Sequence, residues 1–177
     1  KIVIRIEPNM AFGTGTHETT RLCLKAIEEN YRVGETFYDV GTGTGILAIA
    51  VAKLLKKIGK QNSRILLINA CDTDKGSIDI ALENAELNGV GDKINFTTET
   101  ISQKDSKYDF VCANLTADVI VPLLPLLIEK TKRILVLSGI LKEQEDSVLA
   151  ELRKLKIENP KIETSGEWIS VTMVNGK

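Results

Sequence analysis

A glycine-rich stretch constrains the fold of this chain more than any other part of its 177 residues. Residues 39–45 have the sequence Asp-Val-Gly-Thr-Gly-Thr-Gly and lie between the apolar stretch 36–38 and the apolar run 46–52. Glycine tolerates positive φ and close backbone approach, and a helix that begins after such a turn offers unpaired N–H groups. This order predicts a strand, a tight turn and a helix, which together form a ligand-binding corner.

Segments typical of strands and helices alternate along the rest of the chain. Apolar runs and polar–apolar alternation predict strands at 1–6, 36–38, 65–71, 93–98, 108–113, 133–138, 157–162 and 167–174. Helical spacing of apolar residues predicts a first helix that follows a cap at Thr16 and ends near Asn30. The same spacing predicts four further helices, at 46–52, 78–89, 119–128 and 144–155. We expect residues 53–63 to hold a helix end and a loop, and Pro122 and Pro125 to kink their helix or limit it to its first turns.

This alternation predicts an α/β fold with a Rossmann-like, mostly parallel sheet and helices on both faces. The last two strands flank Thr164-Ser165-Gly166, which predicts an antiparallel hairpin at the C-terminus. The length allows one core, so we expect a single domain over residues 1–177. The chain opens at Lys1 without an initiator Met, and we interpret it as a catalytic piece of a longer protein.

Charge and cysteine content exclude several classes of protein. The 23 basic and 24 acidic residues give a net charge of −1, which argues against binding to nucleic acid or a membrane surface through a basic face. No apolar run is long enough to cross a bilayer. The three cysteines stand among apolar neighbours without metal-ligand spacing, so we expect buried thiols, no metal site and a cytoplasmic location.

Polar residues follow the predicted parallel strands where a ligand of an open α/β sheet is expected. They are Asp72, Asn114 and the pair Ser138-Gly139, in addition to the glycine turn. An acidic residue at the position of Asp72 can accept hydrogen bonds from both hydroxyls of a ribose. Asp74 fits better as the cap of the next helix, so the prediction assigns the ligand to Asp72.

The glycine pattern favours one nucleoside ligand over two others. A nicotinamide cofactor would favour Gly-x-Gly-x-x-Gly, and a phosphate-binding loop would need Gly-Lys-Ser/Thr, which the chain lacks. Asp39 places a carboxylate directly before the glycines, where a pyrophosphate would be repelled. These features point to an adenosine ligand that carries positive charge and no phosphate, which describes S-adenosylmethionine.

Several motifs together resemble a known family. The glycine turn with Asp72 resembles the class I S-adenosylmethionine-dependent methyltransferases. Three further stretches are similar to the ribosomal protein L-eleven methyltransferases (PrmA): Met-Ala-Phe-Gly-Thr-Gly-Thr-His-Glu-Thr-Thr at 10–20, Ala-Asn-Leu-Thr-Ala-Asp at 113–118 and Leu-Ser-Gly-Ile-Leu at 137–141. The similarity runs from about Pro8 to the last predicted strand.

The resemblance implies a function and a set of site residues. Family members methylate amino groups of a large-subunit ribosomal protein, which an N-terminal recognition domain binds, and we expect that domain to be absent from these 177 residues. The resemblance assigns cofactor contacts to Thr20, Gly41, Asp72 and Asn114, and closure over the cofactor to the loop Phe12–His17. The full set of expected cofactor-binding residues is Phe12, Thr16, Thr20, Asp39, Gly41, Gly43, Gly45, Asp72 and Asn114.

Asn114 is the expected catalytic residue, because its side-chain carbonyl can accept hydrogens from an amine and orient it. The alternative is that Asn114 only forms a turn after its strand. We expect His17 to be a loop-to-helix hydrogen-bonding residue, and Trp168 to pack under the hairpin or stand at the substrate entrance. Two other functions stay open: a methyltransferase for another protein or a small amine, and a cofactor-binding module without turnover.

Overall fold

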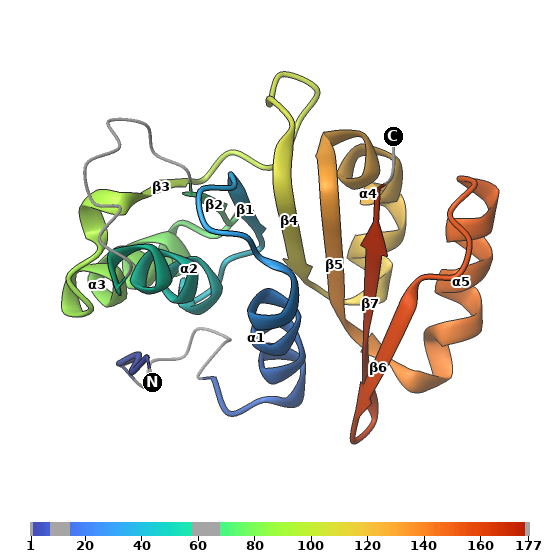
Figure 1. The fold of residues 1–177 in the computed structure, drawn as a ribbon, viewed down its shortest axis with the longest axis horizontal. Helices are drawn as coiled ribbons and strands as arrows, with labels where there is room; N and C mark the ends of the chain where they lie inside the picture. The colour runs from blue at the N-terminus through green and yellow to red at the C-terminus, as the bar shows by residue number, and fades with distance from the viewer. Residues whose placement is uncertain (1, 8–14, 58–67, 176–177) are drawn as a thin grey trace.

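Every strand in the part of the chain that the computed structural model describes, residues 2–7, 15–57 and 68–175, belongs to one seven-stranded sheet (Figure 1). The strand order is β3-β2-β1-β4-β5-β7-β6. The strands from β3 to β5 are parallel, whereas β7 runs antiparallel to β5 and to β6. Their bounds are β1 Phe37–Val40, β2 Ile68–Cys71, β3 Ile94–Thr97, β4 Tyr108–Asn114, β5 Thr131–Leu141, β6 Lys161–Ser165 and β7 Trp168–Val174.

Helices cover both faces of this sheet, so the predicted Rossmann-like fold is confirmed. Buried side chains of α1 and α2 form one apolar cluster, and those of α4 and α5 form the other. Alternate strand residues enter opposite clusters, as Phe37 and Tyr38 of β1 do. The helices are α1 Glu18–Asn30, α2 Ile46–Lys57, α3 Lys75–Leu87, α4 Ala117–Lys130 and α5 Glu145–Lys154, with short 3₁₀ turns at Gly91–Lys93 and Lys142–Gln144.

Helix α4 continues through both of its prolines, so the predicted early end is wrong. Each proline removes one helical hydrogen bond and costs about 3 kcal/mol in a helix interior. Against this loss, Ile120, Leu124 and Leu127 on the opposite side are at most 1% exposed, and burying each such side chain contributes about 1.5–3 kcal/mol. Pro122 and Pro125 are exposed, so the apolar face and its packing decide the outcome.

One predicted strand is wrong and another begins later than predicted. Residues 2–7 belong to no strand, and the backbone N–H groups of Arg5 and Glu7 bond to asparagine side chains in α3 and at its C-cap. Residues 157–160 are also outside the sheet. Lys156 adopts φ 64° and the Ile157 N–H donates to the Leu152 carbonyl, which ends α5 in a left-handed cap and delays β6 until residue 161.

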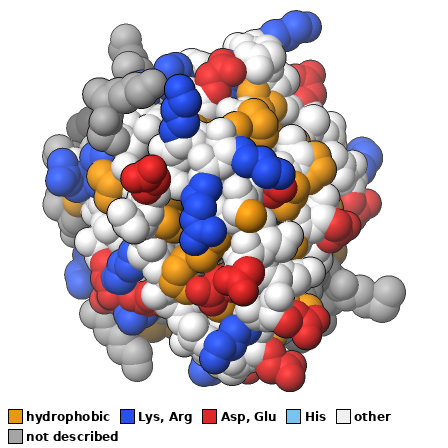
Figure 2. Space-filling model, turned by 90° about the vertical axis from the view of Figure 1, so that its right-hand side faces the viewer, with side chains coloured by type: hydrophobic (Ala, Val, Ile, Leu, Met, Phe, Trp, Pro, Cys, Tyr) orange, Lys and Arg blue, Asp and Glu red, His pale blue; other side chains and the backbone are white. Residues whose placement is uncertain are grey.

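Strand β6 is an edge of the sheet, and charged side chains tie it to α1. Lys25 and Lys161 alternate with Glu29 and Glu163 in a ring of ion pairs. The two shortest join Nζ of Lys161 to Oε2 of Glu29 and to Oε1 of Glu163, both at 2.7 Å. Figure 2 shows charges of both signs interspersed on the side of the molecule where α5 and β6 lie. Charged side chains along an edge strand disfavour pairing with a further strand.

The C-terminal hairpin follows the prediction. Ser165 of β6 pairs with Trp168 of β7, and Gly166 adopts φ 58° between them. Residues 53–57 lie within α2, so the helix end expected in the segment 53–63 is confirmed. The expected Phe12 and the segment 58–67, which holds the predicted loop and the start of a predicted strand, lie outside the described residues.

Candidate functional site

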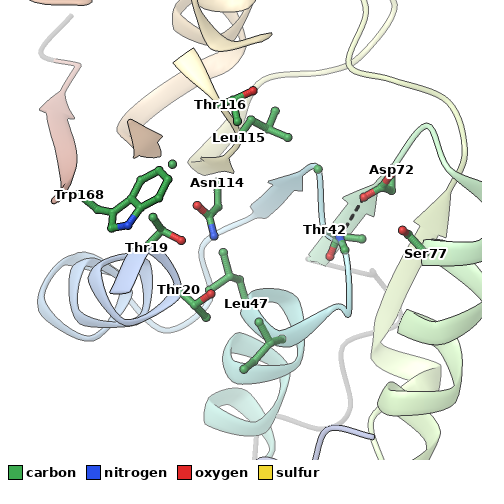
Figure 3. A pocket seen from close by; sticks show the side chains of 14 residues that line it. Thr19, Thr20, Thr42, Leu47, Asp72, Ser77, Asn114, Leu115, Thr116 and Trp168 are labelled. Atoms are coloured by element: carbon green, nitrogen blue, oxygen red, sulfur yellow. Dashed lines mark hydrogen bonds between the residues drawn. The ribbon is translucent and has the colours of Figure 1, made fainter. Parts of the chain in front are cut away.

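A cavity of about 330 Å³ opens where β1 and β4 diverge, at the carboxyl ends of the parallel strands (Figure 3). From β1 the chain proceeds to β2 on one side and returns to β4 on the other, so this is the switch point of the sheet. Its lining comes from the starts of α1, α2 and α3, the glycine turn, the residue after β2, the end of β4 with the residues that follow it, a glycine of β5 and the start of β7. The residues are Thr19, Thr20, Gly41, Thr42, Gly43, Ile46, Leu47, Asp72, Ser77, Asn114, Leu115, Thr116, Gly139 and Trp168.

The three glycines of the turn have different tasks, although all adopt positive φ. Gly41 and Gly43 line the cavity, and a Cβ on Gly41 would lie 2.3 Å from a methyl carbon of Leu115. A Cβ on Gly45 would lie 3.0 Å from Cβ of Ala81, so Gly45 permits close packing of the turn on α3. The structure therefore places Gly45 at a helix contact and not among the cavity-lining residues.

The end of β2 fixes the conformation of the glycine turn. The carbonyl of Cys71 accepts hydrogen bonds from the N–H groups of Gly41 and Thr42, at 2.9 and 2.8 Å. Asp72 lines the cavity, and its Oδ2 accepts the Gly43 N–H at 3.0 Å, as Figure 3 shows. Asp74 instead accepts the Ser77 N–H at 2.8 Å and caps α3, so the cap expected at Asp74 is confirmed, while the ligand role expected for Asp72 stays a prediction.

Asp39 lies behind the turn and is fully buried. Its Oδ2 accepts a hydrogen bond of 2.7 Å from the Thr42 hydroxyl, while Oδ1 has no partner among the described residues. Burial raises the pKa of Asp39 to about 6, although the Thr42 hydrogen bond lowers it. Asp39 does not belong to the residues that line the cavity, and the cofactor contact expected for it stays a prediction.

Two lining residues present buried oxygen atoms without a partner in the described part of the chain. They are Oγ1 of Thr20, at the start of α1, and Oδ1 of Asn114, at the end of β4. A buried polar atom without a hydrogen bond costs about 1–3 kcal/mol, so both atoms indicate a place where a ligand supplies the missing donor. In Figure 3 the side chains of Thr20 and Asn114 stand on the same side of the glycine turn.

His17 and Trp168 connect the start of α1 to the C-terminal hairpin. Nδ1 of His17 accepts the Thr19 N–H at 3.3 Å and caps the helix, so the hydrogen-bonding role expected for His17 is confirmed and the cap expected at Thr16 is wrong. The rings of His17 and Trp168 meet edge to face with centroids 5.1 Å apart. Trp168 therefore packs under the hairpin and also lines the cavity, whereas Thr16 is exposed and lies outside the described lining.

Sequence reasoning missed part of the lining. Ile46 and Leu47 follow the glycine turn, but nothing in an apolar helix distinguishes a cavity-facing residue from a core residue. Ser77 lies in none of the motifs found in the sequence, and Leu115 lies in the stretch 113–118, where only Asn114 was assigned a role. Thr19 could have been found, because it is the hydroxyl residue adjacent to Thr20 at a helix start.

The described residues show neither a metal cluster nor a membrane-spanning helix. No group of three or more His, Cys, Asp or Glu residues there could hold a metal ion. None of the helices described is both long and apolar enough to span a membrane.

Known proteins are similar to this chain in sequence and in fold. The sequence model of the family described as "Ribosomal protein L11 methyltransferase (PrmA)" matches residues 1–176. The chain belongs to this family. A relative from Caldicellulosiruptor bescii, named "Ribosomal protein L11 methyltransferase", is 39% identical over 173 residues, which are 97% of this chain and 54% of the relative. The chain thus spans about half the length of the curated relatives it matches.

Solved structures agree with the PrmA assignment. The crystal structure of a ribosomal protein L11 methylase from Lactobacillus delbrueckii subsp. bulgaricus superposes with a TM-score of 0.82 at 30% identity, and the match covers 98% of this chain and 85% of that chain. A magnesium protoporphyrin IX methyltransferase from Synechocystis, solved with bound SAM, has a TM-score of 0.64 at 16% identity over 89% of this chain and 78% of that one. The second likeness shows a shared fold.

Proposed function

We propose that this chain transfers methyl groups from S-adenosylmethionine to amino groups of ribosomal protein L11, a protein of the large ribosomal subunit. The observation that carries the proposal is the pair of unpartnered buried oxygens, on Thr20 and Asn114, in a cavity at the switch point of a PrmA-family fold. We further propose that residues 1–177 form one catalytic domain and act in the cytoplasm. The three buried free cysteines and a ribosomal substrate support that compartment.

The lining fits S-adenosylmethionine in shape and chemistry. The cavity volume of about 330 Å³ lies within the range of about 300–1,000 Å³ typical of ligand pockets. Each carboxylate oxygen of Asp72 accepts one backbone N–H, at 3.0 Å, and retains a lone pair for a ribose hydroxyl. Gly41 and Gly43 allow the ligand to approach the backbone, and Ile46 and Leu47 offer apolar contact.

The proposed set of cofactor-holding residues retains the sequence assignment at Thr20, Gly41, Gly43, Asp72 and Asn114, which line the cavity. When bound, S-adenosylmethionine supplies an electrophilic methyl group next to a sulfonium. A related fold holds the same cofactor in the Synechocystis enzyme, which supports this choice over NAD.

The protein contributes orientation more than proton transfer. Asp72 is the only ionisable side chain among the described residues that line the cavity, and it lies at the glycine turn. A lysine amine has a pKa near 10.4, so exposing its lone pair at neutral pH costs roughly 4 kcal/mol. Positioning can offset about 7–11 kcal/mol of a barrier, and apolar surroundings such as Leu115 lower the pKa of an amine.

Asn114 is the proposed catalytic residue of this chain. Its unpartnered Oδ1 can accept a hydrogen bond from the amine and direct the nitrogen lone pair into the cavity. The nearby backbone is fixed, because the Leu115 N–H donates to the Ser138 carbonyl at 3.0 Å. Such an acceptor orients the amine without itself taking a charge.

Calorimetry with S-adenosylhomocysteine and with NAD tests the cofactor. Binding of NAD without binding of S-adenosylhomocysteine contradicts the proposal. Incubation of ribosomal protein L11, or of a ribosomal extract, with tritiated S-adenosylmethionine and gel fluorography then tests the substrate. Label on a different protein, or only on small amines, would replace the ribosomal assignment by one of the alternatives.

The variant Asn114→Ala separates catalysis from binding alone. We expect turnover to fall about 100- to 1,000-fold while the affinity for S-adenosylhomocysteine changes much less, because the lost contact orients the acceptor. Asn95→Ala on β3 is the matched control, since Asn95 is exposed and outside the lining. Equal loss of turnover and affinity in Asn114→Ala would favour a binding module.

A further inference from the structure

The N-terminal segment 2–7 is held on the protein although it belongs to no strand. Ile4 and Ile6 pack against the apolar cluster beside α1 and α2, and the residues that alternate with them, Val3, Arg5 and Glu7, are exposed. This alternation is the pattern of a half-buried strand, which is why the sequence predicted one. The backbone of the segment nevertheless needs hydrogen-bond partners, and α3 provides them.

Two asparagines, one in α3 and one at its C-cap, take the place of a neighbouring strand. Asn88 accepts the Arg5 N–H at 3.0 Å and donates to the Arg5 carbonyl at 2.6 Å. Asn84, one helical turn earlier, accepts the Glu7 N–H at 3.1 Å. Residues four apart on a helix share a face, as do residues two apart on an extended chain, so the two spacings match.

Asn84 has a second contact that Asn88 does not share. Its Nδ2 donates a hydrogen bond of 3.0 Å to the carbonyl of Thr44, inside the glycine turn. Asn84 is only 1% exposed, so water does not replace either bond. Asn88 instead bonds to Lys53 of α2, at 3.0 Å, and to the carbonyl of Asn84. A single buried amide thus connects segment 2–7 to the turn that lines the cavity.

We propose that Asn84 is a positioning residue that couples the packing of residues 2–7 on the protein to the conformation of the glycine turn. Thr44 stands between Gly43, whose N–H bonds to Asp72, and Gly45, which packs on α3. A change in the hydrogen bond between Glu7 and the Asn84 side chain therefore alters the bond from Asn84 to Thr44, and with it the backbone that lines the cavity. Coupling between two sites is reciprocal, so a ligand on the turn also steadies residues 2–7.

The first measurement uses the free protein and needs no ligand. Glu7→Pro removes the N–H that bonds to Asn84 and leaves the Asn84–Thr44 bond intact. We expect faster amide hydrogen exchange at Gly43 and Gly45 in this variant. Glu7→Ala is the matched control, because it removes an exposed side chain and keeps the N–H, so its exchange stays at the wild-type rate. Unchanged exchange at the turn in Glu7→Pro would overturn the coupling.

The second measurement adds S-adenosylhomocysteine and rests on the proposed function. Binding should slow amide exchange at Arg5 and Glu7 in the wild type, and Asn84→Ala should lower affinity about five- to fiftyfold and abolish this slowing. Asn88→Ala releases Arg5 but lacks a bond to the turn, so its affinity should stay within about twofold of wild type. Circular dichroism and thermal melting confirm that each variant is folded.

The two measurements distinguish a failure of the proposed function from a failure of the coupling through Asn84. A wild type that does not bind S-adenosylhomocysteine contradicts the proposed function, and the exchange of the free variants still decides the coupling. Binding with equal affinity in the wild type, Asn84→Ala and Asn88→Ala contradicts the coupling and leaves the proposed function intact. Equal loss in both asparagine variants also contradicts it, because general loosening of α3 would then explain both.

Discussion

The backbone N–H of Gly43 donates a hydrogen bond of 3.0 Å to Oδ2 of Asp72 and so joins the turn after β1 to the end of β2. Asp72 also accepts the Asp74 N–H through Oδ1, at 3.0 Å. The carboxylate is therefore oriented before any ligand arrives. Its free lone pairs face a cavity lined mostly by apolar and hydroxyl side chains.

Replacement of Asp72 by Ala should weaken binding of S-adenosylhomocysteine. Hydrogen bonds to a charged group contribute about 1.5–3 kcal/mol, so we expect a loss of about ten- to hundredfold by calorimetry. Asp74→Ala is the control, because Asp74 caps α3 outside the described lining. That variant should lose about 1 kcal/mol of stability and keep its affinity. Equal weakening by both variants would contradict a ligand role for Asp72.

How far the sequence predicts this fold depends on which interactions are local. The glycine turn, the buried strands and the Asp74 cap depend on residues close together in the chain, and all of them were predicted. The course of α4 through Pro122 and Pro125 depends on packing against the sheet, which no local rule contains. The N-terminal segment shows the same limit, since asparagines 77 or more positions away supply its partners.

The site was predictable to a similar extent. Parallel strands bring their carboxyl ends together, so Asp72 and Asn114 could be assigned from their positions alone. The direction of the Asp39 side chain could not be predicted, because only the structure shows it turned behind the loop towards Thr42. Trp168 reaches the cavity through the register of an antiparallel hairpin distant in sequence from the other lining residues, and a single sequence leaves that register open.

Trp168 should report ligand binding by fluorescence. It is the only tryptophan of the chain, and it lines the cavity while its ring meets His17. A ligand in the cavity changes the polarity around the indole, so titration with S-adenosylhomocysteine should change its emission with the midpoint found by calorimetry. Trp168→Phe should abolish the signal. Heat of binding without any change in wild-type emission would place the ligand away from Trp168.

Gly139 should tolerate no side chain. It adopts φ 85° at an irregularity in the β5–β7 pairing, and a Cβ there would lie 2.3 Å from the Leu115 carbonyl oxygen. Gly139→Ala should therefore cost about 2–4 kcal/mol of unfolding free energy in urea titrations, from backbone strain plus the clash.

Gly166→Ala isolates the strain from the clash. Gly166 also has positive φ, at 58°, but a Cβ there would meet only the side chain of Glu18, at 3.8 Å. This variant should lose about 1–2 kcal/mol. If both variants lose the same free energy, the close approach of β5 to Leu115 has no energetic consequence.

The buried carboxyl of Asp39 should make stability depend on pH. Burial raises its pKa from 3.8 to about 6. Because the folded pKa is above the unfolded one, the native state binds this proton more tightly than the unfolded chain does. The contribution to stability is complete below pH 4 and is lost as the pH rises to about 6, by about 3 kcal/mol in total.

Urea unfolding of Asp39→Asn between pH 4 and 7 tests this sign. The variant keeps the volume and an acceptor for the Thr42 hydroxyl but cannot ionise. Its unfolding free energy minus that of the wild type should therefore increase with pH, by about 2–3 kcal/mol across this range. The same difference for Asp74→Asn should stay nearly level across this range, because hydrogen bonds from Ser77 lower the pKa of Asp74 below its ordinary 3.8 and their stabilisation is lost only as the pH falls below about 4. Parallel profiles of the wild type and Asp39→Asn would mean that the Asp39 carboxyl ionises as easily in the folded protein as in the unfolded chain.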